Sequence, residues 1–157
     1  MTIQFPTVTG SNLQRRKLTF PADLTSELTI TLIAFQQWQQ HLIDTWLPEA
    51  ERVEQQYPGL SYYELPVIRK MNILSRTFIN EGMRAGIPNT KARERTVTFY
   101  TDKRNFKEAL GIIGESTIHV LLVDKQGRVL WRTNGEFSPE KGNALEAAIQ
   151  EQLVIGN

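Results

Sequence analysis

The chain has 157 residues, a formal net charge of +1 and no cysteine. This length predicts one domain over residues 1–157, with residues 1–27 as an N-terminal extension, and it is enough to bury a core without disulfides. The near-neutral charge excludes a strong overall attraction to nucleic acid or anionic membrane. The lack of cysteine excludes disulfides, thiolate metal sites and a cysteine nucleophile.

Neither a leader nor a membrane span is expected. Residues 1–6 lack the basic segment and apolar run of a secretory signal. The most apolar early stretch, Leu28–Phe35, is far shorter than the roughly 20 residues of a spanning helix. We therefore expect a cytoplasmic protein without a transmembrane segment, and peripheral membrane association is left open.

The first half of the chain predicts a strand, a helix and a second strand. Leu28–Phe35 is short, apolar and rich in β-branched residues, which is typical of a buried strand. A helix follows over Leu42–Tyr57, with Pro48 expected to kink it. Its apolar positions recur at steps of three and four: Leu42, Ile43, Trp46, Leu47, Ala50, Val53 and Tyr57. Leu60–Ile68 is the second strand, and Pro66 favours a position near an end or an edge.

The second half continues the alternation of helices and strands. A helix over Met71–Ala85 has Met71, Ile73, Leu74, Phe78 and Met83 as its expected apolar side. A strand over Arg95–Tyr100 comes next, followed by a helix over Asn105–Leu110 that Gly111 ends. Two strands, Thr117–Val123 and Val129–Trp131, are then joined by the turn at Asp124–Gly127. The last helix begins at Ser138–Pro139 and runs to about Leu153.

This order predicts an α/β fold with a central mixed β-sheet flanked by helices. The N-terminal Phe5–Pro21 segment is a candidate for a small added hairpin.

The spacing of the first helix resembles that of the thioredoxin/peroxiredoxin-like superfamily. Those proteins place an apolar aromatic residue at the end of the first core strand, then C-x-x-C, then a kinking proline, with four residues in each interval. Phe35, Gln40, Ile43 and Pro48 have this spacing without a gap. The hairpin over Leu121–Val129 is similar to the family's apolar strand, D-x-x-G turn and returning strand. The resemblance implies a thioredoxin-like fold.

Within that superfamily the chain resembles the mitochondrial ATP synthase assembly-factor ten family and its bacterial relatives. The similar segments are Phe5-Pro6 with Gly10 and Leu13, Ala34-Phe35 with Asp44-Thr45-Trp46, Tyr63–Ile68, Phe106 with Ala109–Gly111, and Leu122–Asp124 with Gly127-Arg128 and Trp131. The resemblance implies a non-enzymatic assembly or chaperone-like role, with a membrane subunit of the ATP synthase as protein partner.

Compared with active members, the residues for thiol chemistry are missing. The C-x-x-C window reads Gln40-His41-Leu42-Ile43, and an amide and an alkyl chain cannot attack a disulfide or a peroxide. Gln37 stands where a peroxiredoxin has threonine, and no proline precedes the strand at Ile118 or His119, where the family has a cis-proline. We therefore expect a redox-inactive protein with no catalytic residue and no cofactor.

A binding groove is the functional hypothesis for the former active site. Its candidate residues are Trp38, Gln39, Gln40 and His41 with Thr117, Ile118 and His119. These side chains offer amide donors and acceptors beside an aromatic ring. The equally weighted alternative is a solvated loop with Trp38 folded onto the core.

The two histidines are expected to be neighbours in this fold. His41 and His119, with Asp44 one turn after His41, then define a candidate for a weak metal or pH-sensitive site. The favoured alternative is that the pair is accidental, because two histidines and one carboxylate are few ligands for zinc. No bound metal is therefore expected.

A cluster of basic residues has two interpretations. It consists of Arg84, Lys91, Arg93 and Arg95, with Glu94 as its one acidic neighbour. The cluster is either a docking loop for acidic lipid or a protein partner or, as favoured, a solvated loop. Without interleaved aromatic residues it does not indicate nucleic acid.

Glu64 is either a buried acid with a shifted pKa or, as favoured, a residue on the polar face that pairs with an arginine such as Arg69.

The leading hypothesis is thus a redox-inactive, thioredoxin-like, protein-binding assembly factor. The alternatives are a divergent peroxiredoxin-like enzyme that uses a non-cysteine group, and a module that binds a small ligand or a metal. A flat apolar patch at the groove favours protein binding, and a deep pocket with convergent polar groups favours an enzyme or ligand site.

Overall fold

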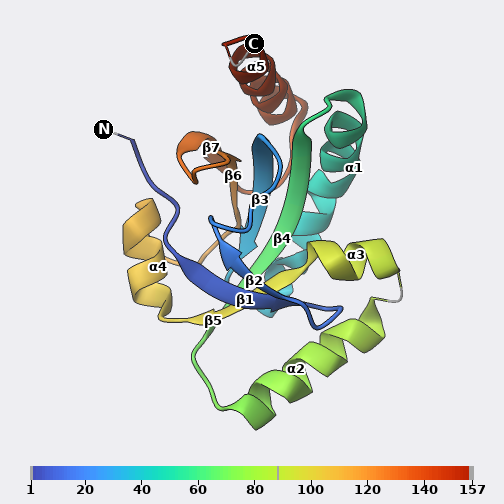
Figure 1. Cartoon of the computed structure of the whole chain (residues 1–157), viewed down its shortest axis with the longest axis vertical. Coiled ribbons are helices and arrows are strands. Elements are labelled where there is room, and N and C mark those ends of the chain that lie inside the picture. The colour runs from blue at the N-terminus through green and yellow to red at the C-terminus, as the bar shows by residue number, and fades with distance from the viewer. Residues whose placement is uncertain (1, 88, 156–157) are drawn as a thin grey trace.

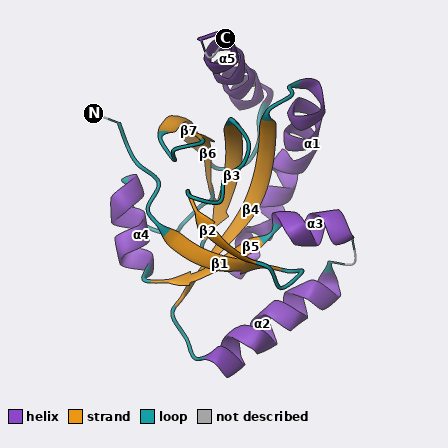
Figure 2. Ribbon diagram, in the orientation of Figure 1, coloured by secondary structure: helices purple, strands orange, loops and turns teal. Residues whose placement is uncertain are grey.

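A twisted seven-stranded sheet organises the chain, with helices outside it (Figures 1 and 2). The computed structural model describes residues 2–87 and 89–155. The strand order is β2-β1-β5-β4-β3-β6-β7. The β3–β4 and β4–β5 pairs are parallel and the remaining pairs are antiparallel, which confirms the α/β fold with a mixed sheet.

The strands are β1 (Val8–Asn12), β2 (Lys17–Phe20), β3 (Leu28–Ala34), β4 (Leu60–Arg69), β5 (Val97–Thr101), β6 (His119–Asp124) and β7 (Val129–Asn134). The helices are the 3₁₀ turn η1 (Gln37–Gln39), α1 (Gln40–Gln56), α2 (Ile73–Gly86), α3 (Thr90–Arg95), α4 (Lys103–Leu110) and α5 (Pro139–Ile155).

Strand β3 lies in the interior of the sheet, between β4 and β6, as its composition predicts. Six of its seven residues are buried. Parallel pairing runs from Leu28↔Leu60 to Ala34↔Pro66 on one side, and antiparallel pairing joins β3 to β6 on the other. Because side chains alternate between the faces of a strand, β3 supplies both hydrophobic clusters of the molecule.

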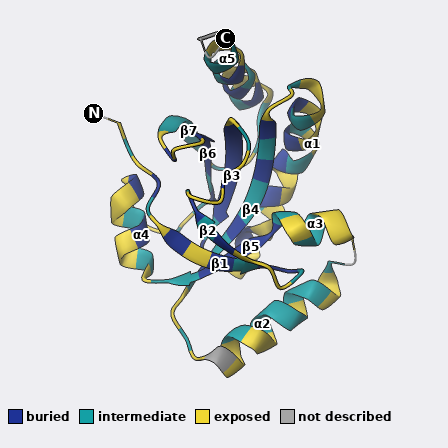
Figure 3. Cartoon of the chain, in the orientation of Figure 1, coloured by how far each residue is buried: buried dark blue, intermediate teal, exposed yellow. Residues whose placement is uncertain are grey.

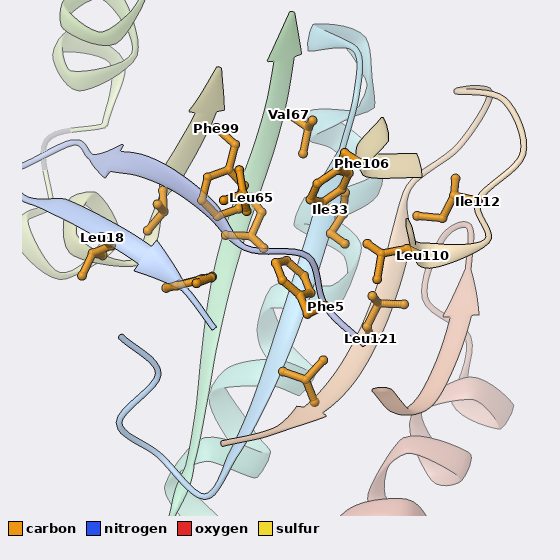
Figure 4. Packing of buried hydrophobic residues seen from close by; sticks show 14 of the residues in the cluster. Phe5, Leu18, Ile33, Leu65, Val67, Phe99, Phe106, Leu110, Ile112 and Leu121 are labelled. Carbon is orange, nitrogen blue, oxygen red and sulfur yellow. The ribbon is translucent and has the colours of Figure 1, made fainter. Parts of the chain in front are cut away.

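The first hydrophobic cluster, here the α4-side cluster, lies between the sheet and α4 (Figure 4). Phe5 from the N-terminal segment, Phe106 and Leu110 from α4, and Ile33 and Leu65 from the sheet meet there. The second, the α1-side cluster, lies under α1 and α5 and consists mainly of the residues Ile30, Leu32, Ile43, Trp46, Val53, Val120, Leu122, Leu145 and Ile149. The predicted apolar side of the first helix is thereby confirmed, and Pro48 lies inside that helix.

The N-terminal residues form a β1–β2 hairpin, and β1 joins the main sheet by pairing with β5. Gly10 permits this close approach, because a Cβ at that position would lie 2.3 Å from the backbone oxygen of Thr98 and 2.6 Å from the Phe99 ring. A glycine at the contact between two strands therefore positions the hairpin.

Helix ends follow simple capping chemistry. The side chains of Asn72, Asn89 and Asp102 accept hydrogen bonds from the first turns of α2, α3 and α4, respectively. Gly111 ends α4 in the left-handed conformation, with φ of 66°. Ser138 caps α5 just before Pro139, as predicted, by accepting a hydrogen bond from the Lys141 backbone.

Some predictions about these elements need correction. Of the two positions predicted for Pro66, an end or an edge, the edge is wrong because β4 lies inside the sheet. Pro66 is instead the last β4 residue that pairs with β3, just before β4 begins to pair with β5 at Val67, so its missing N–H costs little. The short helix α3 lies where a loop was expected.

The apolar side predicted for α2 is wrong in part, since Leu74 is 83% and Phe78 is 82% exposed. None of the described side chains of α2 is buried, although Met83 is half-buried (Figure 3). The side chain of Ile73 lies outside the described residues. The periodicity of α2 is helical, but its two largest exposed apolar residues are not covered by the sheet.

Among the described residues, no helix combines the length and hydrophobicity needed to cross a bilayer.

Candidate functional site

The former active-site segment, residues 35–43, leaves the carboxyl end of β3 and enters α1 through η1. Phe35 is buried against Phe106, and Ile43 is buried in the α1-side cluster. The intervening polar residues turn the chain between these two apolar anchors. The segment occupies the position expected from its spacing.

Gln39 holds this turn together from inside the protein. Its side chain is fully buried, and its Oε1 accepts hydrogen bonds from the backbone N–H groups of Phe35 (2.9 Å) and Gln36 (3.2 Å). Its Nε2 donates to the carbonyl oxygen of Glu115 at 2.6 Å. One amide therefore satisfies three backbone groups where β3 ends. Gln39 is a structural residue, and because it is fully buried it does not line the predicted binding groove.

The loop before β6 is attached to the same turn through Glu115. This carboxylate pairs with Lys103 (3.1 Å) and Lys107 (2.9 Å) of α4 and accepts a hydrogen bond from Gln36 Nε2 at 2.7 Å. Lys103 also donates to the carbonyl oxygen of Phe35 at 2.9 Å. Partial burial opposes ionisation of Glu115, but the hydrogen bonds from Lys107 and Lys103 prevail and lower its pKa. Sequence reasoning missed this network, because only the fold brings residue 115 beside residue 36.

Gln40, at the position of the first thiol, bridges two carboxylates. Its Nε2 donates to Oδ1 of Asp44 at 3.0 Å and to Oε1 of Glu64 at 3.1 Å. Burial raises the pKa of Glu64, the hydrogen bond from Gln40 opposes that shift, and the nearby Asp44 charge adds to it. Glu64 is half-buried with a raised pKa, which supports the interpretation of an acid with a shifted pKa. The favoured alternative, pairing with an arginine such as Arg69, is not seen, because Gln40 is the hydrogen-bond partner of Glu64.

Trp38 and His41 form the exposed part of the segment. Trp38 is 55% exposed, and the His41 ring lies beside it, with 5.9 Å between ring centroids. The His41 Nδ1 lies 2.6 Å from the carbonyl oxygen of Trp38, so this contact orients the imidazole. The indole is not folded onto the core.

The residues predicted on the second wall of the groove are mostly covered. Ile118 is fully buried, and its carbonyl oxygen accepts a hydrogen bond from Gly135 at 3.1 Å. Thr117 and His119 are half-buried. The structure therefore gives an exposed ridge of Trp38, Gln40 and His41 and not the predicted two-walled groove.

The histidines lie on opposite faces of the sheet, which contradicts the predicted pairing. His119 has the same alternation as Leu121 of the α4-side cluster, and its ring packs against Phe35 at 6.3 Å between centroids. His41 belongs to α1, which covers the other face. Burial, with a contribution from Arg132, lowers the pKa of His119.

Metal binding by His41, His119 and Asp44 is therefore not supported. Within residues 2–87 and 89–155, no group of three or more His, Asp or Glu side chains is arranged to hold a metal ion.

The peptide bonds that lead into β6 are trans. In the part of the chain that the structure describes, the cis bond is Phe20–Pro21, at the end of β2. The described residues before β6 thus contain no counterpart of the family's cis-proline.

The basic residues after α2 are not a simple solvated loop. Arg93 donates to the carbonyl oxygens of Ile87 and Arg84, and Arg95 pairs with Glu54 and stacks on the Tyr62 ring, 4.3 Å from its centroid. Both guanidinium groups thus have structural contacts, whereas Lys91 is exposed.

Two surface cavities lie away from the exposed ridge. One, of about 190 Å³, is bounded by the β1–β2 turn and α2. The other, of about 350 Å³, lies beside Tyr62 and Arg95. The ridge itself presents an indole, an amide and an imidazole, groups that can bind a surface but do not supply an activated nucleophile.

The fold and the ridge define a thioredoxin-like protein that has no thiol. Similar solved structures support the fold. One is a thiol:disulfide interchange protein from Bacteroides sp., with a TM-score of 0.62 and 16% identity over 94% of this chain and 88% of that one. Another is BsSco, a member of the Sco family of cytochrome c oxidase assembly proteins, with a TM-score of 0.63 and 10% identity over 94% of each chain. A third is a thiol:disulfide interchange protein DsbE from Chlorobium tepidum, described as putative in function, with a TM-score of 0.57 and 17% identity over 96% of this chain and 95% of that one.

The chain belongs to the ATP10 protein family, an ATP synthase assembly family whose pattern matches residues 1–151. The resemblance found in the sequence is thereby confirmed. No curated protein is significantly similar to the chain.

Replacement of Gln39 by leucine tests the internal hydrogen bonds of the turn. Gln39→Leu keeps a side chain of similar size but leaves buried N–H and C=O groups without partners, so we expect a loss of about 1–3 kcal/mol in the free energy of unfolding. Urea denaturation measures it. The exposed neighbour gives the control, and Gln37→Leu is expected to change stability by less than about 0.5 kcal/mol. Equal effects of the two substitutions contradict the structural role of Gln39.

Replacement of Glu64 by glutamine tests its raised pKa. The carboxyl is protonated in both folded and unfolded chains at low pH, and its ionisation destabilises the folded chain as the pH rises through the unfolded and then the folded pKa. Glu64→Gln is therefore expected to stabilise the protein at pH 7 and to lose this advantage below the unfolded pKa. Thermal unfolding across this pH range measures the difference. The exposed Glu108, substituted as Glu108→Gln, serves as control, and a stabilisation by Glu64→Gln that does not vary with pH rejects the interpretation.

Proposed function

We propose that this protein is a redox-inactive assembly factor that binds a subunit of the ATP synthase. Membership of the ATP10 family supports the ATP synthase as target. The observation that carries the redox-inactive part is the occupation of the two thiol positions by Gln40 and Ile43. Gln40 is engaged by two carboxylates and Ile43 is buried in the core, so neither position presents a reactive group.

The exposed ridge of Trp38, Gln40 and His41 is the proposed contact surface. Trp is enriched at the centres of protein interfaces because its large apolar ring also carries a hydrogen-bond donor. Gln39 and the Glu115 network hold the backbone beneath Trp38 in place, so the indole reaches solvent from a fixed base. A preorganised aromatic side chain loses little conformational entropy on binding.

Binding without catalysis also agrees with the shape of the site. Enzyme pockets usually enclose a ligand and bring polar groups together around it. The predicted second wall is instead filled by Ile118 and by the half-buried ring of His119. The ridge is thus suited to a protein surface.

The test is assembly of ATP synthase in cells of the source organism that lack this protein. We expect native gels to show less assembled enzyme, with restoration by the wild-type chain. Trp38→Ala is expected to restore much less, because it removes the exposed ring without disturbing Gln39. Ile113→Ala is the matched control, since Ile113 is 95% exposed and lies outside the ridge. Unchanged assembly in the deletion strain contradicts the proposed target, and full restoration by Trp38→Ala contradicts the proposed surface.

A further inference from the structure

Helix α2 lies along one side of the molecule, and its inward side is largely polar, with Ile79 and Met83 half-buried beside the polar residues. The hydroxyl of Tyr100, on β5, lies 2.8 Å from Asn80 Oδ1, and the Arg76 guanidinium lies 5.7 Å from the centroid of the Tyr100 ring. Glu81 pairs with Arg15 of the β1–β2 turn at 2.8 Å. Polar and charged contacts therefore attach this helix to the sheet.

The apolar side of α2 faces solvent. Leu74 and Phe78 are one turn apart and more than four-fifths exposed, and Gly82 and Ala85 on the same side of the helix are exposed as well. A surface helix of a soluble protein normally has the opposite orientation, with its apolar side on the core. An exposed apolar helix face of this kind is typical of an interaction site.

Basic side chains from three segments surround this helix. The β1–β2 hairpin contributes Arg15 and Arg16 in its turn and Lys17 at the start of β2, the segment that leads from β4 into α2 contributes Arg69 and Lys70, and α3 contributes Lys91. Leu13 in that turn donates its backbone N–H to the carbonyl oxygen of Arg93 at 3.0 Å, and Arg93 in turn donates to the carbonyl oxygen of Arg84 at 2.9 Å. The turn, α3 and α2 thus form one continuous surface, here named the α2 surface.

Charge is strongly segregated onto this surface. Residues 15–17 and 69–95, counted together with Glu54, the ion-pair partner of Arg95, carry ten Lys and Arg and three Asp and Glu, a net charge of +7, so the rest of the chain carries −6 to give the total of +1. The near-neutral total conceals this division, so a local attraction to anionic surfaces exists that the overall charge does not indicate.

We propose that the α2 surface docks on a bilayer that contains anionic phospholipid. Leu74 and Phe78 enter the boundary between headgroups and acyl chains, and the surrounding Lys and Arg contact lipid phosphates. A second copy of the chain fits this surface poorly, because two strongly positive surfaces repel each other. Anionic lipid complements both properties of the surface, its positive charge and its apolar centre.

Docking also orients the ridge. β3 and β4 are parallel neighbours, so their carboxyl ends lie at the same end of the sheet. The connections that follow them, η1 and the segment into α2, both start from that end. Binding through α2 therefore brings the end of the sheet that carries Trp38 toward the membrane. This inference concerns lipid and does not depend on the proposed ATP synthase target.

The test is sedimentation of the purified chain with vesicles of phosphatidylcholine alone or with about a third phosphatidylglycerol. We expect at least about tenfold tighter binding to the anionic vesicles, weakened as the salt concentration rises from about 0.1 M to about 1 M. The double variant Leu74→Ser, Phe78→Ser and the double variant Arg69→Gln, Lys70→Gln are each expected to reduce that binding about tenfold or more. All four residues are exposed, so both variants should fold, which thermal unfolding checks.

Ile113→Ser and Lys125→Gln are the matched controls, because both residues are exposed and lie outside the α2 surface. They should leave vesicle binding unchanged. Failure of the wild-type chain to bind anionic vesicles overturns the proposal, as does equal binding by the Leu74→Ser, Phe78→Ser variant. A wild-type dimer in light scattering that this variant converts to a monomer, without vesicle binding, shows instead that a second copy covers α2. If the wild-type chain does not bind vesicles and the Leu74→Ser, Phe78→Ser variant loses ATP synthase assembly, a protein covers α2 instead.

Discussion

Burial of β3 on both faces and both edges is the constraint on which the arrangement of the molecule depends. Its backbone groups pair with β4 on one side and β6 on the other, and its side chains enter the two hydrophobic clusters alternately. The end of such a strand has little freedom. Phe35 is held in the α4-side cluster, so the polar segment that follows must turn out of the sheet at a fixed place, where α1 begins. The ridge owes its position to this turn.

In thiol-active relatives this turn presents a reactive sulfur, and in this chain its polar side chains are directed to hydrogen bonding. Gln39 satisfies the backbone of the turn, and Gln40 connects Asp44 with Glu64. The same turn exposes the Trp38 ring to solvent. An exposed aromatic ring on a fixed turn is consistent with a binding role, and the α2 surface at the same end of the strands adds a means of bringing that ring to a membrane.

The sequence predicts those features that depend on local pattern. The composition of Leu28–Phe35 predicts the buried strand, and the three- and four-residue steps after Leu42 predict α1. The thioredoxin-like fold is implied by the resemblance of the spacing from Phe35 to Pro48 to that of the thioredoxin/peroxiredoxin-like superfamily. Pattern does not show what covers a face: the periodicity of α2 marks Leu74 and Phe78 as one side, but only the packing shows that this side is outward. It also does not give the face of His119, which depends on the register of β6 against β3, or the partners of Gln39, which come from residue 115.

The central claim, that Trp38 contacts an ATP synthase subunit, is tested most directly by photo-crosslinking from that position. A chain with benzoylphenylalanine at position 38 is expressed in its own cells, irradiated, and its adducts are identified by mass spectrometry. The proposal predicts an adduct with an ATP synthase subunit from position 38 and none from position 113, which is more open to solvent but lies outside the ridge. No ATP synthase adduct from position 38, or the same adduct from both positions, contradicts the claim.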